Sequence, residues 1–154
     1  QVVNLSVAGG DNQIVRKAFD KALEQGLILV AAAGNWGANG KPAYPAAYRD
    51  VVAVTALDRQ RQPYAKANHG SYIDFAAPGV GIYTPVPRGG RVMSGTSFAT
   101  PYITVLLAAQ IEAGAPKVAS RLSEMLSRRA TDLGDPGRDD VFGWGLVHLW
   151  PRCP

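Results

Sequence analysis

The chain has 154 residues, 47% of them hydrophobic and 18% charged, with a formal net charge of +4. This balance predicts one globular domain, and a single cysteine, Cys153, excludes a small disulfide-stapled fold. No apolar run approaches the roughly 18 residues of a membrane-spanning helix, and the scattered basic residues carry no nucleic-acid-binding motif. We therefore expect neither a membrane nor a nucleic acid as a partner.

The N-terminal part of the chain predicts a strand, a helix and a second strand. Val2–Ser6 is a short apolar run that begins almost at Gln1, which indicates that sequence upstream is missing. Asp11 is a candidate helix cap. The helix after it carries an apolar stripe: Val15, Ala18, Phe19, Ala22 and Leu23. Leu27–Ala33 is apolar on both faces, which is typical of a parallel strand covered by helices on each side.

The C-terminal part predicts two more strands, two helices and a closing segment. Val51–Ala56 is expected to form a further buried strand, and Tyr72–Phe75 another. A helix from Thr96 to about Ile111 is apolar nearly all round, as at the centre of a domain. A second helix is expected from about Pro116 to Arg129. Four of its residues should face the core: Val118, Leu122, Met125 and Leu126. Phe142–Val147 is expected to form a closing edge segment.

These elements predict one α/β domain over residues 1–150 and a short tail over residues 151–154. The expected fold is a doubly wound, mostly parallel sheet flanked by helices. We expect it to be incomplete at its N-terminal side.

Two polar residues stand where chemistry is plausible. Ser97 opens the predicted central helix, where the dipole and free N–H groups favour negative charge. The local sequence alone favours a plain helix cap at this position, since serine caps are common. Asn35 ends the buried strand Val30–Ala33 after Gly34, and a simple turn explains that pair. A functional alternative exists for Asn35, because ligands bind at the carboxyl edge of parallel sheets. A side-chain amide there can donate to an oxyanion.

Five segments in a fixed order decide between these alternatives. They are Val3–Ser6 followed by Gly9-Gly10, Ala31–Asn35, Tyr44–Tyr48, Asp74–Gly79 and Gly95–Pro101. The set resembles the C-terminal half of the catalytic domain of the subtilases, the subtilisin-like serine proteases, over nearly the full length of the chain. The resemblance implies a subtilisin-like fold and a serine endopeptidase that works through an acyl-enzyme.

The resemblance also implies roles for individual residues. Ser97 matches the nucleophile, and Asn35 matches the oxyanion-hole amide that acts with the backbone N–H of Ser97. Ser6, Val7 and Ala8 match a strand along which a substrate peptide pairs. Ala32, Ala33 and Gly34 match one wall of the main specificity pocket. Ala43 matches its floor, where an alanine in place of glycine favours small to medium apolar side chains.

Two members of the catalytic triad have no match in the chain. In the family the Asp and the His precede the serine, in Asp-Thr/Ser-Gly and His-Gly-Thr motifs that are absent here. His69 mimics the second motif superficially but follows Asn35, so we interpret it as a surface-loop residue, and Asp74 as part of a structural turn. The missing N-terminal half of the domain is expected to supply the Asp and the His.

Other expectations also rest on the resemblance. Subtilases often bind calcium through backbone carbonyls, and Ala46, Tyr48 and Val51 occupy the matching positions. The acidic loop Asp135–Asp140 lacks the spacing of a calcium loop, so we expect no metal and no cofactor. The family implies a polypeptide substrate and secretion or periplasmic export. A sheet that lacks its first strands exposes apolar surface, which predicts a non-native dimer.

Two other functions stay open at this point. One is a catalytically inactive, subtilase-like pseudoprotease that only binds peptides, although such a groove needs neither Ser97 nor Asn35. The other is a non-proteolytic α/β binding module, which no phosphate-binding glycine loop supports.

Overall fold

The computed structural model describes residues 1–147. The tail over 151–154, the end of the 1–150 domain, His148 and Cys153 therefore lie outside the described residues. Among the described residues, no helix is long and apolar enough to cross a membrane.

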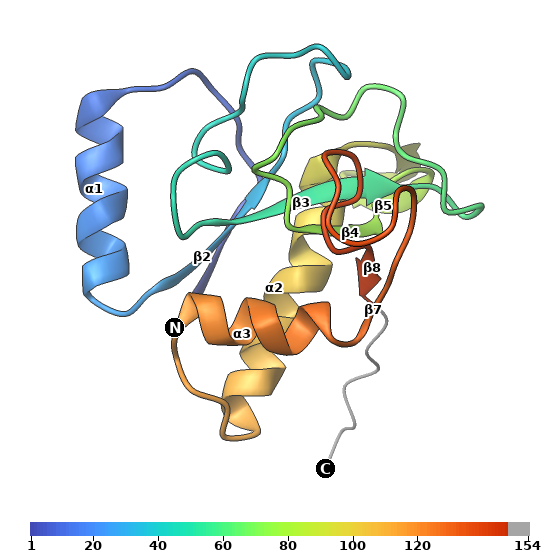
Figure 1. The fold of residues 1–154 in the computed structure, drawn as a ribbon. Coiled ribbons are helices and arrows are strands. Elements are labelled where there is room, and N and C mark those ends of the chain that lie inside the picture. Colours follow the sequence, from blue (N-terminus) through green and yellow to red (C-terminus); the bar gives the residue numbers. More distant parts are fainter. Residues whose placement is uncertain (148–154) are drawn as a thin grey trace.

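A six-stranded sheet in the order β1-β2-β3-β4-β8-β7 forms the centre of the fold (Figure 1). The strands are β1 (Val2–Leu5), β2 (Ile28–Ala32), β3 (Val52–Leu57), β4 (Phe75–Pro78), β7 (Ala130–Thr131) and β8 (Leu146–Val147). The pairs β1–β2, β2–β3, β3–β4 and β4–β8 are parallel, whereas β7 runs antiparallel to β8. The predicted α/β class with a mostly parallel sheet is confirmed.

Helices cover both faces of this sheet. The helix α1 (Gln13–Glu24) packs Phe19 and Leu23 against one face of β2 and β3. The helices α2 (Thr96–Glu112) and α3 (Ala119–Ser127) pack against the other face, where Ile103 and Leu122 are fully buried. In Figure 1 α1 lies to the left of β2, and α2 lies on the other side of the sheet. The strands β2 and β3 are buried along their whole length, as their continuous apolar sequence predicts.

The start of α1 differs from the prediction by one residue. Asn12, not Asp11, caps the helix, since its Oδ1 accepts from the N–H groups of Ile14 (2.9 Å) and Val15 (3.1 Å). Asp11 instead forms an ion pair with Arg16 at 2.6 Å. Val15 is 42% exposed, so the inward stripe begins later in the helix than its spacing suggests.

The central helix α2 buries one side only. Ala99, Ile103 and Leu107 lie in the core, but Tyr102 is 46% exposed and Val105 is 56% exposed. The predicted extent of α2 is confirmed, and its all-round apolar character leaves an apolar strip without cover. We call Tyr102 and Val105 the open face of α2.

Three predicted elements in the C-terminal part are wrong in detail. The strand placed at Tyr72–Phe75 is β4, which begins only at Phe75. The helix placed at Pro116–Arg129 is the shorter α3, and Val118, predicted to point inward, precedes it and is 50% exposed. The closing segment is not an edge, because β8 pairs with β4 on one side and β7 on the other.

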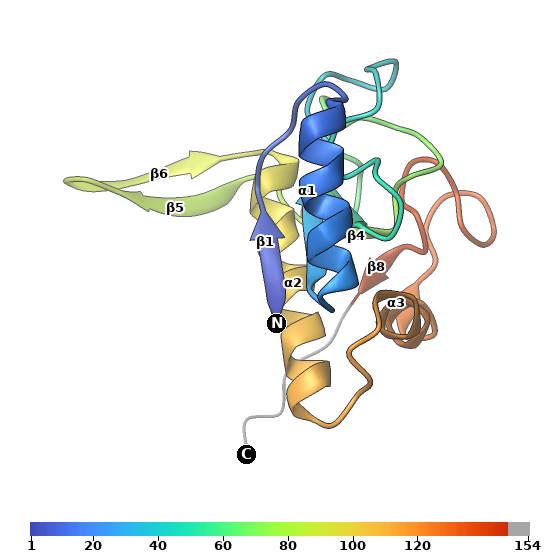
Figure 2. The same cartoon turned by 90° about the vertical axis from the view of Figure 1, so that its left-hand side faces the viewer.

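A projecting hairpin has no counterpart in the prediction. It consists of β5 (Ile82–Val86) and β6 (Gly89–Met93), which pair with each other in a separate two-stranded sheet. Figure 2 shows it extending away from the body of the domain. Its second strand leads directly into Gly95 and α2.

Candidate active site

Three chain segments meet at the carboxyl edge of the parallel sheet. Ser6–Ala8 follow β1, Ala33–Asn35 follow β2, and Ser97 is the second residue of α2. Because β1 and β2 are parallel neighbours, the residues that follow them emerge at the same edge. The structure therefore brings together Ser6, Asn35 and Ser97, which are far apart in the sequence.

Asn35 contacts the first turn of α2 through its side-chain oxygen. Asn35 Oδ1 accepts from the backbone N–H of Thr96 at 3.0 Å and from Thr96 Oγ1 at 3.2 Å. Thr96 Oγ1 also accepts from the N–H of Gly34 at 3.3 Å. The buried Thr96 thus ties the end of β2 to the helix that carries Ser97.

This bonding fixes the orientation of the Asn35 amide. A backbone N–H can bond only to the oxygen of a side-chain amide, so the oxygen faces Thr96. The opposite end, Nδ2, presents the donors. The N–H of Ser97 belongs to the first turn of α2, where backbone donors lack partners inside the helix. Asn35 Nδ2 lies near Gly95, the residue before α2, since a Cβ added at Gly95 would lie 3.4 Å from it.

Ser6 and Ser97 are linked by reciprocal hydrogen bonds. Pro101 has no N–H, so the carbonyl of Ser97 four residues earlier has no partner within α2. Ser6 Oγ donates to that carbonyl at 2.9 Å, and Ser97 Oγ donates to the carbonyl of Ser6 at a long 3.4 Å. Ser97, the nucleophile candidate, is half-buried. Because its hydroxyl makes only this long hydrogen bond, the hydroxyl can rotate. Because Gly95 caps α2 without a side chain, Ser97 is not the N-cap.

A polar chain extends behind this pair. Asn4 Nδ2 donates to Ser6 Oγ at 2.9 Å, and Asn4 Oδ1 accepts from Thr104 Oγ1 at 3.0 Å. Thr104 lies two turns into α2, so β1 is connected to the helix at two levels. This network fixes the segment that continues into Ser6, Val7 and Ala8.

The residues predicted to form the specificity pocket are small and buried. Ala32, Ala33 and Ala43 are at most 1% exposed. Gly34 has φ +103°, and a Cβ added there would lie 2.8 Å from Ala43 Cβ. The predicted wall and floor are thus in contact. Val7, on the predicted substrate strand, is 60% exposed, so that strand is accessible.

Sequence reasoning missed several residues that support the site. Thr96 and Asn68 are both buried polar residues, and both hold the segment around Asn35. Asn68 stands next to His69, which is half-buried in the loop between β3 and β4. The sequence around Asn68, an asparagine close to Gly70, indicates only a turn. No sequence feature indicates that the Asn68 side chain is buried.

Known proteins are similar to this chain over nearly its full length. The sequence model of the Subtilase family matches residues 1–145. The chain belongs to the subtilase family. Minor extracellular protease Epr of Bacillus subtilis (strain 168) is 40% identical over 149 residues, which are 95% of the chain and 23% of that protein. Subtilisin DY of Bacillus licheniformis is 33% identical over 153 residues, 96% of the chain and 55% of that protein.

Solved subtilase structures share the fold. The prenylagaramide maturation protease PagA matches with a TM-score of 0.78 and 29% identity, over 96% of this chain and 58% of that one. The psychrophilic protease S41 matches with a TM-score of 0.85 and 28% identity, over 97% and 57%. The predicted subtilisin-like fold is confirmed. The chain spans between about a quarter and three fifths of the length of these relatives.

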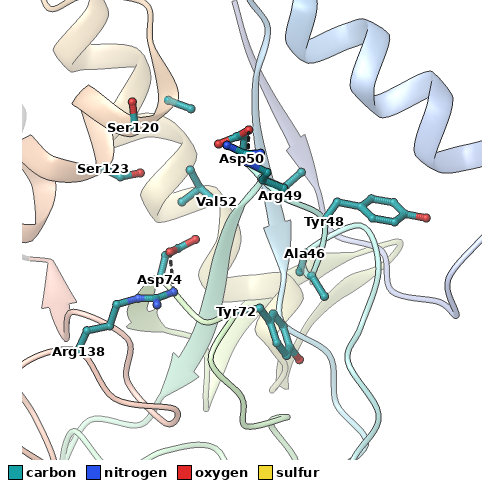
Figure 3. Close-up of a pocket in the computed structure, with 13 residues that line it drawn as sticks. Ala46, Tyr48, Arg49, Asp50, Val52, Tyr72, Asp74, Ser120, Ser123 and Arg138 are labelled. Atoms are coloured by element: carbon teal, nitrogen blue, oxygen red, sulfur yellow. Dashed lines mark hydrogen bonds and ion pairs between the residues drawn. The ribbon is translucent and has the colours of Figure 1, made fainter.

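A separate cleft of about 410 Å³ lies near the amino ends of β3 and β4 (Figure 3). It is lined by the loop 46–52, by Tyr72 and Asp74, by Arg138, and by Ser120 and Ser123 of α3. This is the end of the subtilase sheet opposite to Ser97. The backbone positions that suggested calcium, Ala46, Tyr48 and Val51, border this cleft.

The donors in this cleft do not fit a calcium ion. The cleft lies beside Asp74, whose Oδ1 pairs with Arg138 at 3.1 Å and whose Oδ2 accepts from the N–H of Ala53 at 2.9 Å. The Tyr48 carbonyl accepts from the N–H of Val51. The Arg138 guanidinium beside the Asp74 carboxylate disfavours a cation at that carboxylate, and the expectation of no metal stays a prediction.

Asp74 has a structural role, because it contacts Arg138 and the N–H of Ala53, and the pKa of its carboxyl is raised. Burial raises the pKa of its carboxyl above the usual range, although the Ala53 N–H and the Arg138 guanidinium favour the charged form. A carboxyl whose pKa is higher in the folded state than in the unfolded state stabilises the fold fully below its unfolded pKa of about 3.9. That contribution is lost as the pH rises through the folded pKa.

Replacing Asp74 by asparagine should therefore help at neutral pH. We expect Asp74→Asn to raise the unfolding temperature at pH 7, and to raise it less at about pH 3, because the stabilising contribution of the native carboxyl is lost as the pH rises. Thermal unfolding between about pH 3 and pH 7 measures this difference. Asp20→Asn, on the exposed side of α1, is the control and should show no such trend. A variant that loses stability at pH 7 would contradict the assigned direction.

Proposed function

We propose that this chain is the part of a serine endopeptidase that carries the nucleophile and the oxyanion hole. The observation that carries the proposal is the pair of contacts between Asn35 Oδ1 and Thr96. They hold the oxygen end of the Asn35 amide at the first turn of α2, which leaves its Nδ2 donors available to a carbonyl oxygen. Ser97 is the proposed nucleophile and Asn35 the proposed oxyanion donor.

The proposed reaction divides between this chain and residues outside it. Ser97 Oγ attacks the carbonyl carbon of the scissile peptide bond, and a His outside the chain takes the hydroxyl proton. The carbonyl oxygen becomes an oxyanion that accepts from Asn35 Nδ2 and from the N–H of Ser97. The C–N bond breaks as the His returns the proton to the leaving amine. Water then releases the acyl group from Ser97.

The proposed substrate is an extended polypeptide. Its backbone would pair with Ser6, Val7 and Ala8, all exposed, as an added strand beside β1. Its main side chain would pack on the wall formed by Ala32–Gly34, over the floor at Ala43. The alanine at position 43 favours small to medium apolar side chains. Export from the cell is proposed from the name of one relative, an extracellular protease. No metal or cofactor is part of the proposed chemistry.

A pseudoprotease is the weaker candidate. A groove that only binds peptide needs the exposed Ser6–Ala8 segment and the pocket, but not a nucleophile with an aligned amide. The Thr96 contacts that orient Asn35 add nothing to peptide binding at Ser6–Ala8. They therefore favour the enzyme.

A fluorophosphonate probe tests the proposal directly. The full-length protein should be labelled covalently at Ser97, because the probe reacts only with an activated serine. Peptide mapping of the adduct identifies the residue. A folded, full-length protein that stays unlabelled, or one labelled elsewhere, would refute the enzyme.

The open face of α2 predicts self-association of the 154-residue chain produced alone. In the full-length protein we propose that the missing N-terminal half covers Tyr102 and Val105. In its absence a second copy is the available apolar partner. Sedimentation velocity should show a dimer or larger species, and Val105→Glu should shift it toward monomer. Ile14→Glu, which replaces an 81% exposed residue of α1, should leave it unchanged. A monomeric unmodified chain would contradict the expectation.

A further inference from the structure

Asn68 is a fully buried polar residue whose side-chain amide is bonded at both ends. Its Oδ1 accepts from the N–H of Trp36 at 2.8 Å, and its Nδ2 donates to the carbonyl of Lys41 at 2.8 Å. Its backbone N–H donates to the carbonyl of Gly34 at 3.1 Å. A buried amide is stable only when such bonds are made, and all three partners lie in the loop that contains Asn35.

These bonds bracket Asn35. The carbonyl of Gly34 belongs to the peptide unit before the Asn35 Cα, and the N–H of Trp36 belongs to the peptide unit after it. Both peptide units are bonded to Asn68, one through its backbone and one through its side chain. The two backbone dihedrals of Asn35 are the rotations between these units. Asn68 therefore fixes the direction in which the Asn35 side chain leaves the backbone.

The loop is shaped closely around the Asn68 amide. A Cβ added at Gly34 would lie 2.9 Å from Asn68 Cγ, and one added at Gly40 would lie 2.9 Å from Asn68 Oδ1. Only glycine fits at either position without displacing Asn68. A further bond, from the N–H of Gly37 to the carbonyl of Lys66 at 2.8 Å, holds the same two segments together. The β2–β3 loop and the β3–β4 loop are therefore packed and hydrogen-bonded to each other around Asn68.

We infer that Asn68 is a positioning residue for catalysis, acting through Asn35. Thr96 holds the oxygen end of the Asn35 amide, and Asn68 holds the backbone from which that side chain extends. An oxyanion donor must be placed to within about 0.5 Å to be effective. This inference rests on the proposed function, because it concerns turnover at Ser97.

The test uses the full-length protein and a peptide substrate. Asn68→Ala should lower kcat by about 10- to 100-fold, with KM changed by less than about threefold, because the lost alignment acts in the transition state. Asn39→Ala is the matched control and should leave both constants unchanged, because Asn39 is an exposed asparagine of the β2–β3 loop that contains Asn35. Unchanged kcat in Asn68→Ala would overturn the inference.

A double-mutant cycle separates positioning from general stability. If Asn68 acts through Asn35, Asn68→Ala should cost little further kcat in an Asn35→Ala background. An equal loss of kcat in both backgrounds would overturn the inference. These assays are run below the unfolding temperature of each variant, so that loss of fold does not enter kcat.

Asn68→Asp supplies a variant that can be rescued by pH, should the alanine variant not fold. A protonated carboxyl accepts from Trp36 and donates to Lys41, as the native amide does, whereas a carboxylate only accepts. Burial favours the protonated form. The ratio of variant to native kcat should therefore rise as the pH falls from about 8 to about 5, and a flat ratio would overturn the inference. If the unmodified protein is not labelled at Ser97, the proposed function fails instead.

Discussion

Replacing Ser97 by alanine in the full-length protein should lower kcat by about 10⁶-fold, a magnitude taken from removal of the nucleophile in subtilisin itself. In the proposed mechanism Ser97 Oγ is the atom that forms the acyl bond, and alanine has no such atom. The change should leave the fold intact, because Ser97 Oγ makes one long hydrogen bond of 3.4 Å. The backbone N–H of Ser97 remains in place.

Hydrolysis of an unstructured protein, followed by release of peptides, measures this loss. Ser120→Ala, on the exposed side of α3, is the matched control and should retain full activity. The unmodified 154-residue chain alone should also show no useful turnover, because the proposed general base is a His outside this chain. Full activity in Ser97→Ala, or efficient cleavage by the isolated chain, would contradict the assignment of the nucleophile.

The core of the fold could be predicted because its signals are local. The strands β2 and β3 are continuous apolar runs, and α2 is a long apolar helix; each is recognisable without its neighbours. The hairpin β5–β6 was not recognisable, because its strands lie outside the main sheet and contain no fully buried residue. Without a buried face, the sequence need not alternate between apolar and polar residues, and Pro85, Gly89 and Gly90 suggest a loop instead.

The exact ends of helices could not be predicted either. Asp11 and Asn12 are equally good caps by residue type. In the folded chain the Asp11 carboxylate pairs with Arg16, and Asn12 caps the helix. A one-residue ambiguity of this kind is resolved by side-chain partners and not by propensity.

Some residues of the candidate site could also be predicted from local sequence, and others could not. Ser97 and Asn35 stand in recognisable sequence segments, so both could be named from the sequence alone. Their supporting residues could not, because the contacts join positions far apart: Thr96 to Asn35, Asn68 to Trp36, and Ser6 to Ser97. A buried asparagine and an exposed one look alike in sequence. Only the folded chain distinguishes Asn68 from Asn39.

Asn35→Asp should separate a catalytic role of Asn35 from a structural one. The aspartate keeps an oxygen that can accept from the N–H and the hydroxyl of Thr96, so the link to α2 survives. It also places a negative charge at the N-terminus of α2, which is favourable by about 0.3–1 kcal/mol. We therefore expect the free energy of unfolding to be unchanged or slightly higher.

The activity of Asn35→Asp should fall, although its stability is kept. The aspartate lacks the Nδ2 donors and opposes an oxyanion with its own charge, so kcat should fall by at least the roughly 10²–10³-fold known for loss of this donor in subtilisin. KM should change little, since the ground-state carbonyl carries little charge. Asn35→Ala, which loses both the donor and the Thr96 contacts, should lose stability as well as kcat. If Asn35 only anchored α2, Asn35→Asp would be as active as the native protein and Asn35→Ala alone would be impaired. Chemical denaturation and steady-state kinetics on the same two variants therefore decide between an anchor and an oxyanion donor.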